Sequence, residues 1–313
     1  MAKAYDLSGA TYGSYADGDT SDLFRFSGTH GYADHHVWAC VMAKLSEIRL
    51  SRATRLSVLD AGCGPGTWLK RLVVTAKEMG FIEISARGFD VSAEQIQRAR
   101  VNCRDLSSLP GIRLEFSVGD LTEALPEADE SIDLTLCLYS VLSHIAPADL
   151  PLVARELGRV TRGCLITTVR PVGSMPSALV ASIDEVRRLL HDQQRNWCEV
   201  ELADGCLTAF SFHLFSTDEM SSLFEGMFDI EVIEGLDFFH GRFAADPRWN
   251  PKGHDLPHAL ARELAKLEKS FAANREYSDH ANHLLLIGRK LAHASRSDQR
   301  QRQPKLTLHS VSR

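Results

Sequence analysis

Between residues 56 and 170 the chain alternates short apolar runs with amphipathic segments, and this alternation constrains the fold more than any other feature. The apolar runs are "LSVLD" (56–60), "ISARGFD" (84–90), "IRLEFSV" (112–118), "SIDLTLCLY" (131–139) and "CLITTVR" (164–170). Segments with helical spacing separate them, and one begins with Ser92 and Gln95 at the spacing of a capping box. Strands that alternate with helices predict a parallel sheet covered on both faces, which is a doubly wound α/β fold.

The stretch "LDAGCGPGTW" places Gly62, Gly64 and Gly66 directly after the first predicted strand. A strand that ends in glycines and leads into a helix exposes backbone N–H groups and lets a ligand approach the main chain closely. The dinucleotide fingerprint would need a glycine where this chain has Thr67. The carboxylate of Asp60 would repel a pyrophosphate and would suit a ligand that carries an ammonium group. The loop therefore predicts a site for a nucleoside-like cofactor.

Two further acids follow the next two predicted strands. Asp90 closes the second strand, where a carboxylate can accept hydrogen bonds from both hydroxyls of a ribose. Asp120, in "VGDL", follows the third strand. Ligands of open α/β sheets bind at the carboxyl ends of the strands, so all three acids are expected at one edge. The structural alternatives are a helix cap for Asp90 and a turn residue for Asp120.

Four segments in order, "LDAGCGPG", "GFDVS", "VGDL" and "DLTLCLYSVLSHI", resemble the motifs of the class I S-adenosylmethionine-dependent methyltransferases, in particular the bacterial small-molecule type. The resemblance implies that the glycines hold the methionine and ribose side of the cofactor, with Asp60 near its amino group. It implies that Asp90 binds the ribose hydroxyls and that Asp120 and Leu121 contact the adenine. The predicted cofactor-binding residues are Asp60, Gly62, Cys63, Gly64, Gly66, Asp90, Val91, Asp120, Leu121 and Tyr139.

The resemblance also implies a domain plan. The expected fold is a seven-stranded, mostly parallel sheet whose last strand, "HLLLIGRK", is antiparallel, with a helical N-terminal cap and lid insertions. The expected parts are a cap (1–55), an S-adenosylmethionine-binding core (56–170), a lid insertion (171–216), a completion of the core sheet (217–290) with a substrate loop (236–258), and a disordered tail (291–313). Helical spacing is present over residues 33–49 and 178–194, and Asp204-Gly205 marks a hairpin turn.

Two histidines are candidates for a general base. His144 follows the fourth strand, where a methyl acceptor would sit, so it could deprotonate a hydroxyl or an amine. A histidine that bonds the backbone at a helix end is an equal alternative. His240 is the second candidate, and it lies in the aromatic stretch "DFFHGRFAADPRWNP". That stretch either lines a substrate pocket or is a loop anchored on the core by its aromatic residues.

Other histidines invite a metal interpretation. His30, His35 and His36 are close in sequence, and so are His280 and His283. No cysteines at a matching spacing accompany them, so no metal site is predicted. For His30 the alternative is a cap residue that faces the substrate.

Charge and composition narrow the classes of partner that the chain could bind. The chain has 313 residues and a formal net charge of -6, which argues against broad binding to nucleic acid or to an anionic membrane. The fourth strand ends "CLYSVLSH" and lacks the "NPPY" type of signature that resembling DNA-methylating enzymes carry. Seven cysteines without zinc spacing indicate reduced thiols, and no apolar run is long enough to span a bilayer. We expect a cytoplasmic protein whose partner is a small-molecule methyl acceptor; the oligomeric state is left open.

The predicted reaction is methyl transfer from S-adenosylmethionine to an oxygen or nitrogen nucleophile of a small molecule. One alternative is a nicotinamide-dependent reductase, which Thr67 and Asp60 disfavour. The other is a protein that binds S-adenosylmethionine without catalysis, which the sequence does not separate from an enzyme.

Overall fold

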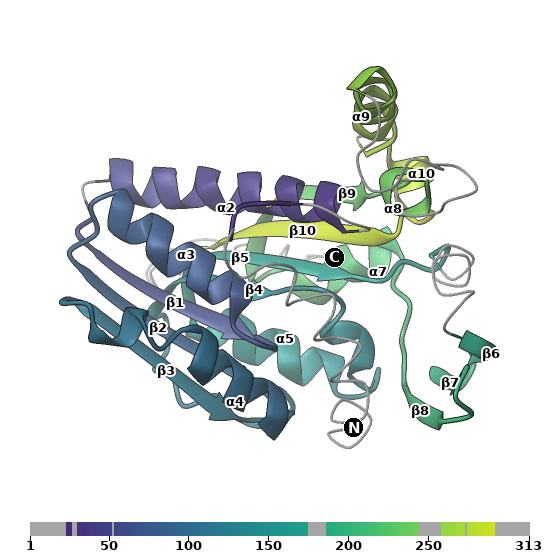
Figure 1. Cartoon of the computed structure of the whole chain (residues 1–313), viewed down its shortest axis with the longest axis horizontal. Helices are drawn as coiled ribbons and strands as arrows, with labels where there is room; N and C mark the ends of the chain where they lie inside the picture. The colour runs from purple at the N-terminus through teal and green to yellow at the C-terminus, as the bar shows by residue number, and fades with distance from the viewer. Residues whose placement is uncertain are drawn as a thin grey trace, which may run out of the picture.

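The computed structural model describes residues 23–26, 30–51, 53–174, 186–243, 258–272 and 274–291. Its centre is a seven-stranded sheet with the order β3-β2-β1-β4-β5-β10-β9 (Figure 1). The strands are β1 (Arg55–Ala61), β2 (Glu83–Asp90), β3 (Ile112–Val118), β4 (Ile132–Cys137), β5 (Thr161–Val169), β9 (Phe228–Leu236) and β10 (His283–Lys290). Only β10 runs antiparallel to its two neighbours in this sheet. The predicted doubly wound, mostly parallel fold with an antiparallel last strand is therefore confirmed.

Helices cover both faces of this sheet (Figure 1). One face carries α2 (Gly31–Leu50), α3 (Thr67–Glu78) and α4 (Ala93–Asn102), and the other carries α5 (Leu150–Val160) and α7 (Thr217–Phe224). Alternate residues of β1 supply the two cores, because successive side chains of a strand point to opposite faces. Val58 packs in the core beneath α2 and α3, whereas Leu59 packs with the residues of α5 and α7.

Local signals in the sequence set several element boundaries. The predicted cap of α4 is present, because the Oγ of Ser92 accepts a hydrogen bond from the backbone N–H of Gln95 at 3.3 Å. The predicted helix over residues 33–49 corresponds to α2, whose buried residues include Val37, Val41 and Leu45. These apolar positions hold α2 against the sheet.

A second, antiparallel sheet lies apart from the first and comprises β6 (Val186–Asp192), β7 (Trp197–Leu202) and β8 (Leu207–Ser211) (Figure 1). We call it the small sheet. The predicted hairpin is confirmed, with Gly205 in the left-handed conformation at φ 84°. The predicted helix over 178–194 is wrong where the structure describes it, because residues 186–192 pair with β7. Tertiary strand pairing has overridden the helical spacing here; residues 178–185 lie outside the described residues.

The remaining elements are short or peripheral. They are η1 (Leu106–Ser108), η2 (Leu142–His144), α8 (His240–Phe243), α9 (His258–Ala272) and α10 (Arg275–Ser278). The predicted substrate loop (236–258) begins with the last residue of β9 and contains α8, and its residues 244–257 lie outside the described residues, as do residues 1–22 and 292–313. Among the helices of the described residues, none combines the length and apolarity that crossing a bilayer requires.

Candidate active site

The loop between β1 and α3 contains three glycines in the left-handed conformation. The φ angles are 77° at Gly62, 50° at Gly64 and 79° at Gly66. The backbone N–H groups of Gly62 and Cys63 both donate to the carbonyl of Phe89, at 2.8 and 2.9 Å, which ties the loop to the end of β2. L side chains rarely adopt this backbone conformation, so glycine is required for the shape of the loop.

The three glycines differ in what surrounds them. A Cβ atom at Gly62 would lie 2.4 Å from a methyl carbon of Val141, and one at Gly66 would lie 3.1 Å from the Cβ of Ala99. A Cβ at Gly64 would meet nothing within 4 Å among the residues that the structure describes. Packing inside the protein therefore explains why residues 62 and 66 are glycines, whereas the space beside Gly64 is open to a ligand.

Asp60, near the end of β1, carries a buried carboxylate with an unsatisfied oxygen. The residue is 2% exposed, and its Oδ2 has no hydrogen-bond partner among the residues that the structure describes. Burial, reinforced by the negative charge of Asp90, raises the pKa of Asp60 to about 7. A bound cation would favour the ionised form and give this oxygen a partner.

Asp90 connects the ends of β1 and β2. One of its oxygens accepts a hydrogen bond from the N–H of Gly64 at 3.0 Å, and the other accepts from the N–H of Ser92 at 2.9 Å. Each oxygen of an ionised carboxylate has room for a second donor. The cap of α4 is Ser92, so Asp90 is not the helix cap that the sequence allowed, and its carboxylate instead ties the glycine loop to the residues before α4.

Asp120 completes the row of acids at the carboxyl edge of the sheet. Its Oδ1 accepts from the backbone N–H and the hydroxyl of Thr122, at 2.9 and 2.8 Å, which is the turn geometry that the sequence allowed. Leu121 beside it is buried, and Val91 after β2 is half-buried. The N–H of Gly119 donates to the carbonyl of Asp90 at 3.0 Å, so the ends of β2 and β3 are held together.

Tyr139 follows β4 and has a strained backbone. Its φ is 53°, and that of Ser140 is 68°. The backbone N–H of Tyr139 donates to the hydroxyl of Thr168 at 2.6 Å, and its phenol is hydrogen-bonded to Asp34. Burial and the charge of Asp34 raise the pKa of Tyr139 well above its usual value. Two consecutive left-handed residues cost about 1–3 kcal/mol each and are typical of functional sites.

His144, the first candidate base, lies in η2 against the small sheet. Its Nδ1 is 3.2 Å from the carbonyl oxygen of Ser211, and its ring contacts Phe210 and Phe212 at 5.4 and 5.2 Å between centroids. Burial and the charge of Arg170 lower the pKa of His144 to about 4, although the contact with Ser211 opposes this shift. The structure therefore joins His144 to the small sheet, and its role as a base stays a prediction.

His240, the second candidate, begins α8 and stacks on Tyr32, with 4.2 Å between ring centroids and 8° between the planes. Its Nδ1 lies 3.2 Å from the Oε1 of Glu268, which also accepts from the N–H of Phe239, and the Oε2 of Glu268 accepts from the N–H of Phe238. These contacts hold the start of α8 on α9. A base role for His240 likewise stays a prediction.

The structure adds residues to the candidate site that no sequence motif marks as catalytic. His283 opens β10, Arg170 follows β5, and Asp34 lies in the first turn of α2. The motifs lie at the carboxyl ends of parallel strands, whereas His283 is the first residue of an antiparallel strand that starts at the same edge. Its only sequence signal was the pairing with His280 as a candidate metal ligand.

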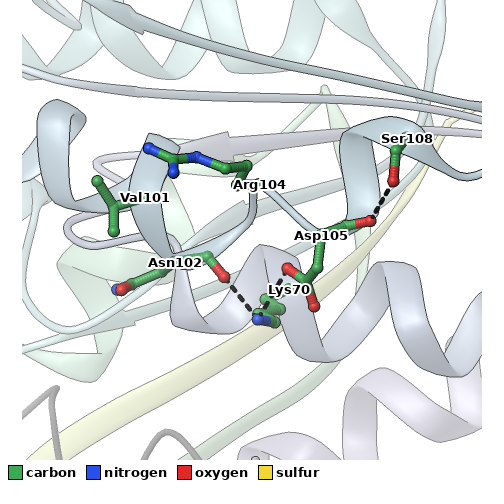
Figure 2. Close-up of a pocket in the computed structure, with 6 residues that line it drawn as sticks. All are labelled: Lys70, Val101, Asn102, Arg104, Asp105 and Ser108. Atoms are coloured by element: carbon green, nitrogen blue, oxygen red, sulfur yellow. Dashed lines mark hydrogen bonds and ion pairs between the residues drawn. The ribbon is translucent and has the colours of Figure 1, made fainter.

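A surface pocket lies away from these residues, between α3, α4 and η1. Figure 2 shows its lining residues, which are Lys70, Val101, Asn102, Arg104, Asp105 and Ser108. The ammonium group of Lys70 points at the carbonyl of Asn102, at 2.5 Å, and at the carboxylate of Asp105, at 3.0 Å (Figure 2). The ammonium group of Lys70 is therefore already paired within the chain. Within the described residues, no group of three or more His, Cys, Asp or Glu side chains has the arrangement of a metal site.

Comparison with known proteins assigns the central part of the chain. Residues 58–163 match the model of the methyltransferase domain family. This segment contains the glycine loop and the three acids, so the resemblance of these motifs to a methyltransferase domain is confirmed.

Two curated relatives match the same proportion of the chain. A probable methyltransferase, ltbC, from Aspergillus luteorubrus is 34% identical over 109 residues, which are 34% of this chain and 36% of that protein. An uncharacterized 37.1 kDa protein in transposon TN4556 from Streptomyces fradiae is 37% identical over 114 residues, which are 34% of this chain and 29% of that protein. The match thus spans about a third of the length of these relatives.

A solved structure extends the likeness over nearly the whole chain. The S-adenosylmethionine-dependent methyltransferase from Clostridium acetobutylicum ATCC 824 superimposes with a TM-score of 0.51, covering 92% of this chain and 99% of that chain. The two sequences are 11% identical, so the likeness concerns the fold.

Proposed function

We propose that this protein transfers a methyl group from S-adenosylmethionine to an oxygen or nitrogen nucleophile of a small molecule. The observation that carries the proposal is the buried Oδ2 of Asp60, which has no hydrogen-bond partner among the described residues. It lies in the strand that leads into the glycine loop, where the space beside Gly64 is open. A buried carboxylate of this kind needs a cationic partner, and the cofactor carries an ammonium group.

The residues at the carboxyl edge suit the rest of the cofactor. Asp60 would pair with the ammonium group, and Asp90 would accept hydrogen bonds from the ribose hydroxyls. The glycine loop with Cys63 would lie along the methionine and ribose. Val91, Asp120 and Leu121 would surround the adenine, and Tyr139 would lie at the end of β4 beside the methionine side. When bound, S-adenosylmethionine supplies a methyl group on a positively charged sulfur.

The chain's own part in such a reaction is to position the acceptor and to exclude water. In this proposal residues 1–55 form a cap, residues 171–216 form a lid that includes the small sheet, and residues 236–258 form a substrate loop. Helix α2 of the cap supplies Asp34 to Tyr139, and the small sheet contacts His144. These contacts support an acceptor site bounded by the cap and the lid. No partner other than a small molecule is proposed.

Calorimetric titration with S-adenosylmethionine, S-adenosylhomocysteine and NADH tests the cofactor. We expect micromolar binding of the first two and none of NADH. Binding of NADH alone would replace the proposal with the nicotinamide-dependent reductase. Release of S-adenosylhomocysteine during incubation with an acceptor panel then separates an enzyme from a protein that only binds the cofactor.

Cofactor binding should depend on pH through Asp60. In the folded protein its pKa is raised from 3.8 to about 7, so the carboxyl group is largely protonated at pH 6 and ionised at pH 7.5. Because an ammonium group attracts only the ionised form, affinity for S-adenosylhomocysteine should rise by up to about eightfold over this interval. Calorimetry at both pH values measures this change in affinity.

The matched variant is Asp60→Asn, whose side chain does not titrate. Its affinity should be weak and equal at both pH values. A flat profile for the wild-type protein would contradict the role of Asp60. The contribution of Asp60 to stability without ligand should move the other way: because its folded pKa is raised, this contribution is fully present below about pH 4 and is lost as the pH rises through about 7.

A further inference from the structure

A buried histidine lies at the carboxyl edge beyond the cofactor residues. His283 is the first residue of β10, where it pairs with Leu236 at the end of β9, and the next residue pairs with Val169 at the end of β5. It is 2% exposed, and its Nδ1 makes no hydrogen bond within the described part of the chain. A buried polar atom without a partner is destabilising, so a ligand is the natural partner for it.

The surrounding rings place His283 beside the position expected for methyl transfer. Its ring centroid is 5.6 Å from that of Tyr139 and 6.1 Å from that of His30, and the latter two are 6.2 Å apart. Tyr139 also lies 5.9 Å from Trp68, at the start of the helix that follows the glycine loop. Three separate elements, the start of α2, the end of β4 and the start of β10, thus meet at one place.

The charge beside His283 is positive. The guanidinium of Arg170 donates a hydrogen bond to the carbonyl of Asn282 at 3.1 Å, directly before His283. Burial and the charge of Arg170 lower the pKa of His30 to about 4 and that of His283 well below its usual value. Both imidazoles are therefore neutral at neutral pH, and the imidazole of His283 carries one N–H group.

The nearby carboxylates do not reverse this charge at His283. Asp34 is hydrogen-bonded to the phenol of Tyr139. Asp237 accepts from the backbone N–H of Gly241 at 2.6 Å and from the side chain of Asn282 at 3.1 Å. Both acids have partners of their own, and the charged or titratable neighbours that shift the pKa of His283 are Arg170 and His30.

We propose that His283, with Arg170 behind it, binds an acidic oxygen of the methyl acceptor, so that the acceptor is a carboxylic acid, an enol or a phenol that reacts as its anion. The proposal rests on the methyl-transfer function proposed above and specifies its substrate class. A guanidinium stabilises a nearby negative charge and repels an ammonium group, and a neutral imidazole can donate its N–H to the oxygen anion. The site therefore selects oxygen acids over amines.

The chemistry balances without a protein base. The acceptor gives its proton to solvent before it binds, and its oxygen anion is positioned by His283. The oxygen forms a bond to the methyl carbon with its own electron pair, while the carbon–sulfur bond breaks and leaves its pair on sulfur. The product is an uncharged ester or ether, which the positive site holds less strongly than the anion.

Three aromatic probes of the same size and different charge test this proposal: benzoate, benzyl alcohol and benzylammonium. Each is titrated into ¹⁵N-histidine-labelled full-length protein, with and without saturating S-adenosylhomocysteine, and followed by the imidazole resonances. We expect benzoate to bind at least about tenfold more tightly than benzyl alcohol, a difference of about 1.4 kcal/mol, and benzylammonium not to bind. The resonance shifted by benzoate should be absent from His283 variants.

Two substitutions separate hydrogen bonding from packing. His283→Leu removes the N–H group and should weaken benzoate binding at least about tenfold, whereas His283→Asn places an amide N–H near the position of Nδ1 and should stay within about threefold of wild type. His309→Leu, near the C-terminal end of the sequence, is the histidine control and should leave benzoate binding unchanged. If the leucine variant does not fold, the asparagine and wild-type proteins still provide the comparison.

The outcomes distinguish the two proposals. If S-adenosylhomocysteine binds but benzoate fails to bind at tens of millimolar, or binds no better than the alcohol, the assignment of an oxygen acid is wrong. Equal benzoate affinity in His283→Leu would also overturn it. If S-adenosylhomocysteine does not bind, the proposed function fails, while the titration of the free protein still decides whether His283 binds an acidic oxygen.

Discussion

Substitution of Asp90 by alanine should lower the affinity for S-adenosylhomocysteine by at least about 100-fold. Two hydrogen bonds from ribose hydroxyls to a charged carboxylate are lost, each worth about 1.5 kcal/mol or more. The variant also loses the acceptors for the N–H groups of Gly64 and Ser92, which shape the loop and the start of α4. Calorimetry with wild-type and variant proteins measures the change.

The control for this substitution is Asp105→Ala. Asp105 is also a carboxylate near α4, but it pairs with Lys70 at the surface pocket (Figure 2). Its removal should leave cofactor affinity unchanged. Asp90→Asn keeps one oxygen for the backbone donors and should show an intermediate loss with a smaller change in melting temperature. An Asp90→Ala protein that melts like wild type and binds S-adenosylhomocysteine within about threefold of it would refute the ribose assignment.

Substitution of Gly64 by alanine should abolish most cofactor binding without a comparable loss of stability. The added Cβ meets no protein atom within 4 Å, so it occupies the open space that the proposal gives to the ligand. At φ 50° the alanine also costs about 1–2 kcal/mol of backbone strain. We expect at least about tenfold weaker binding of S-adenosylhomocysteine in calorimetry, together with a modest fall in melting temperature.

Gly205→Ala is the matched control for that strain. Gly205 has φ 84°, and a Cβ there also meets nothing within 4 Å, but the residue lies in the hairpin turn of the small sheet. Both variants should lose similar stability, and only Gly64→Ala should lose binding. Equal binding of S-adenosylhomocysteine in the two variants would show that the space beside Gly64 is not part of the cofactor site.

The fold was predictable over residues 56–170 because local patterns there agree with the tertiary structure. The apolar runs are buried strands, and the cap at Ser92 begins α4 at the expected position. Asp60, Asp90 and Asp120 reach one edge because parallel strands all end on the same side. The order of the motifs along the chain was enough to place them.

The prediction of secondary structure failed where pairing with distant strands decides the structure. Residues 186–192 have helical spacing, yet Leu189 pairs with Val200 and His191 pairs with Cys198 in an antiparallel ladder. A strand gains its stability from neighbours that are distant in sequence, so local spacing is a weak guide there. The role of His144 shows the same limit, because its contact with Ser211 depends on where the small sheet lies.

The sequence by itself determined the class of the fold, the glycine loop and the acids of the proposed cofactor site, because these depend on short motifs and on the period of apolar residues. Only the tertiary structure showed that the oxygen of Asp60 lacks a partner among the described residues and that a Cβ at Gly64 would meet open space. Only it brought His30, Tyr139 and His283 together. Burial, charge and close approach are properties of residues far apart in the chain, and they arise when the antiparallel β10 and helix α2 pack on the core sheet.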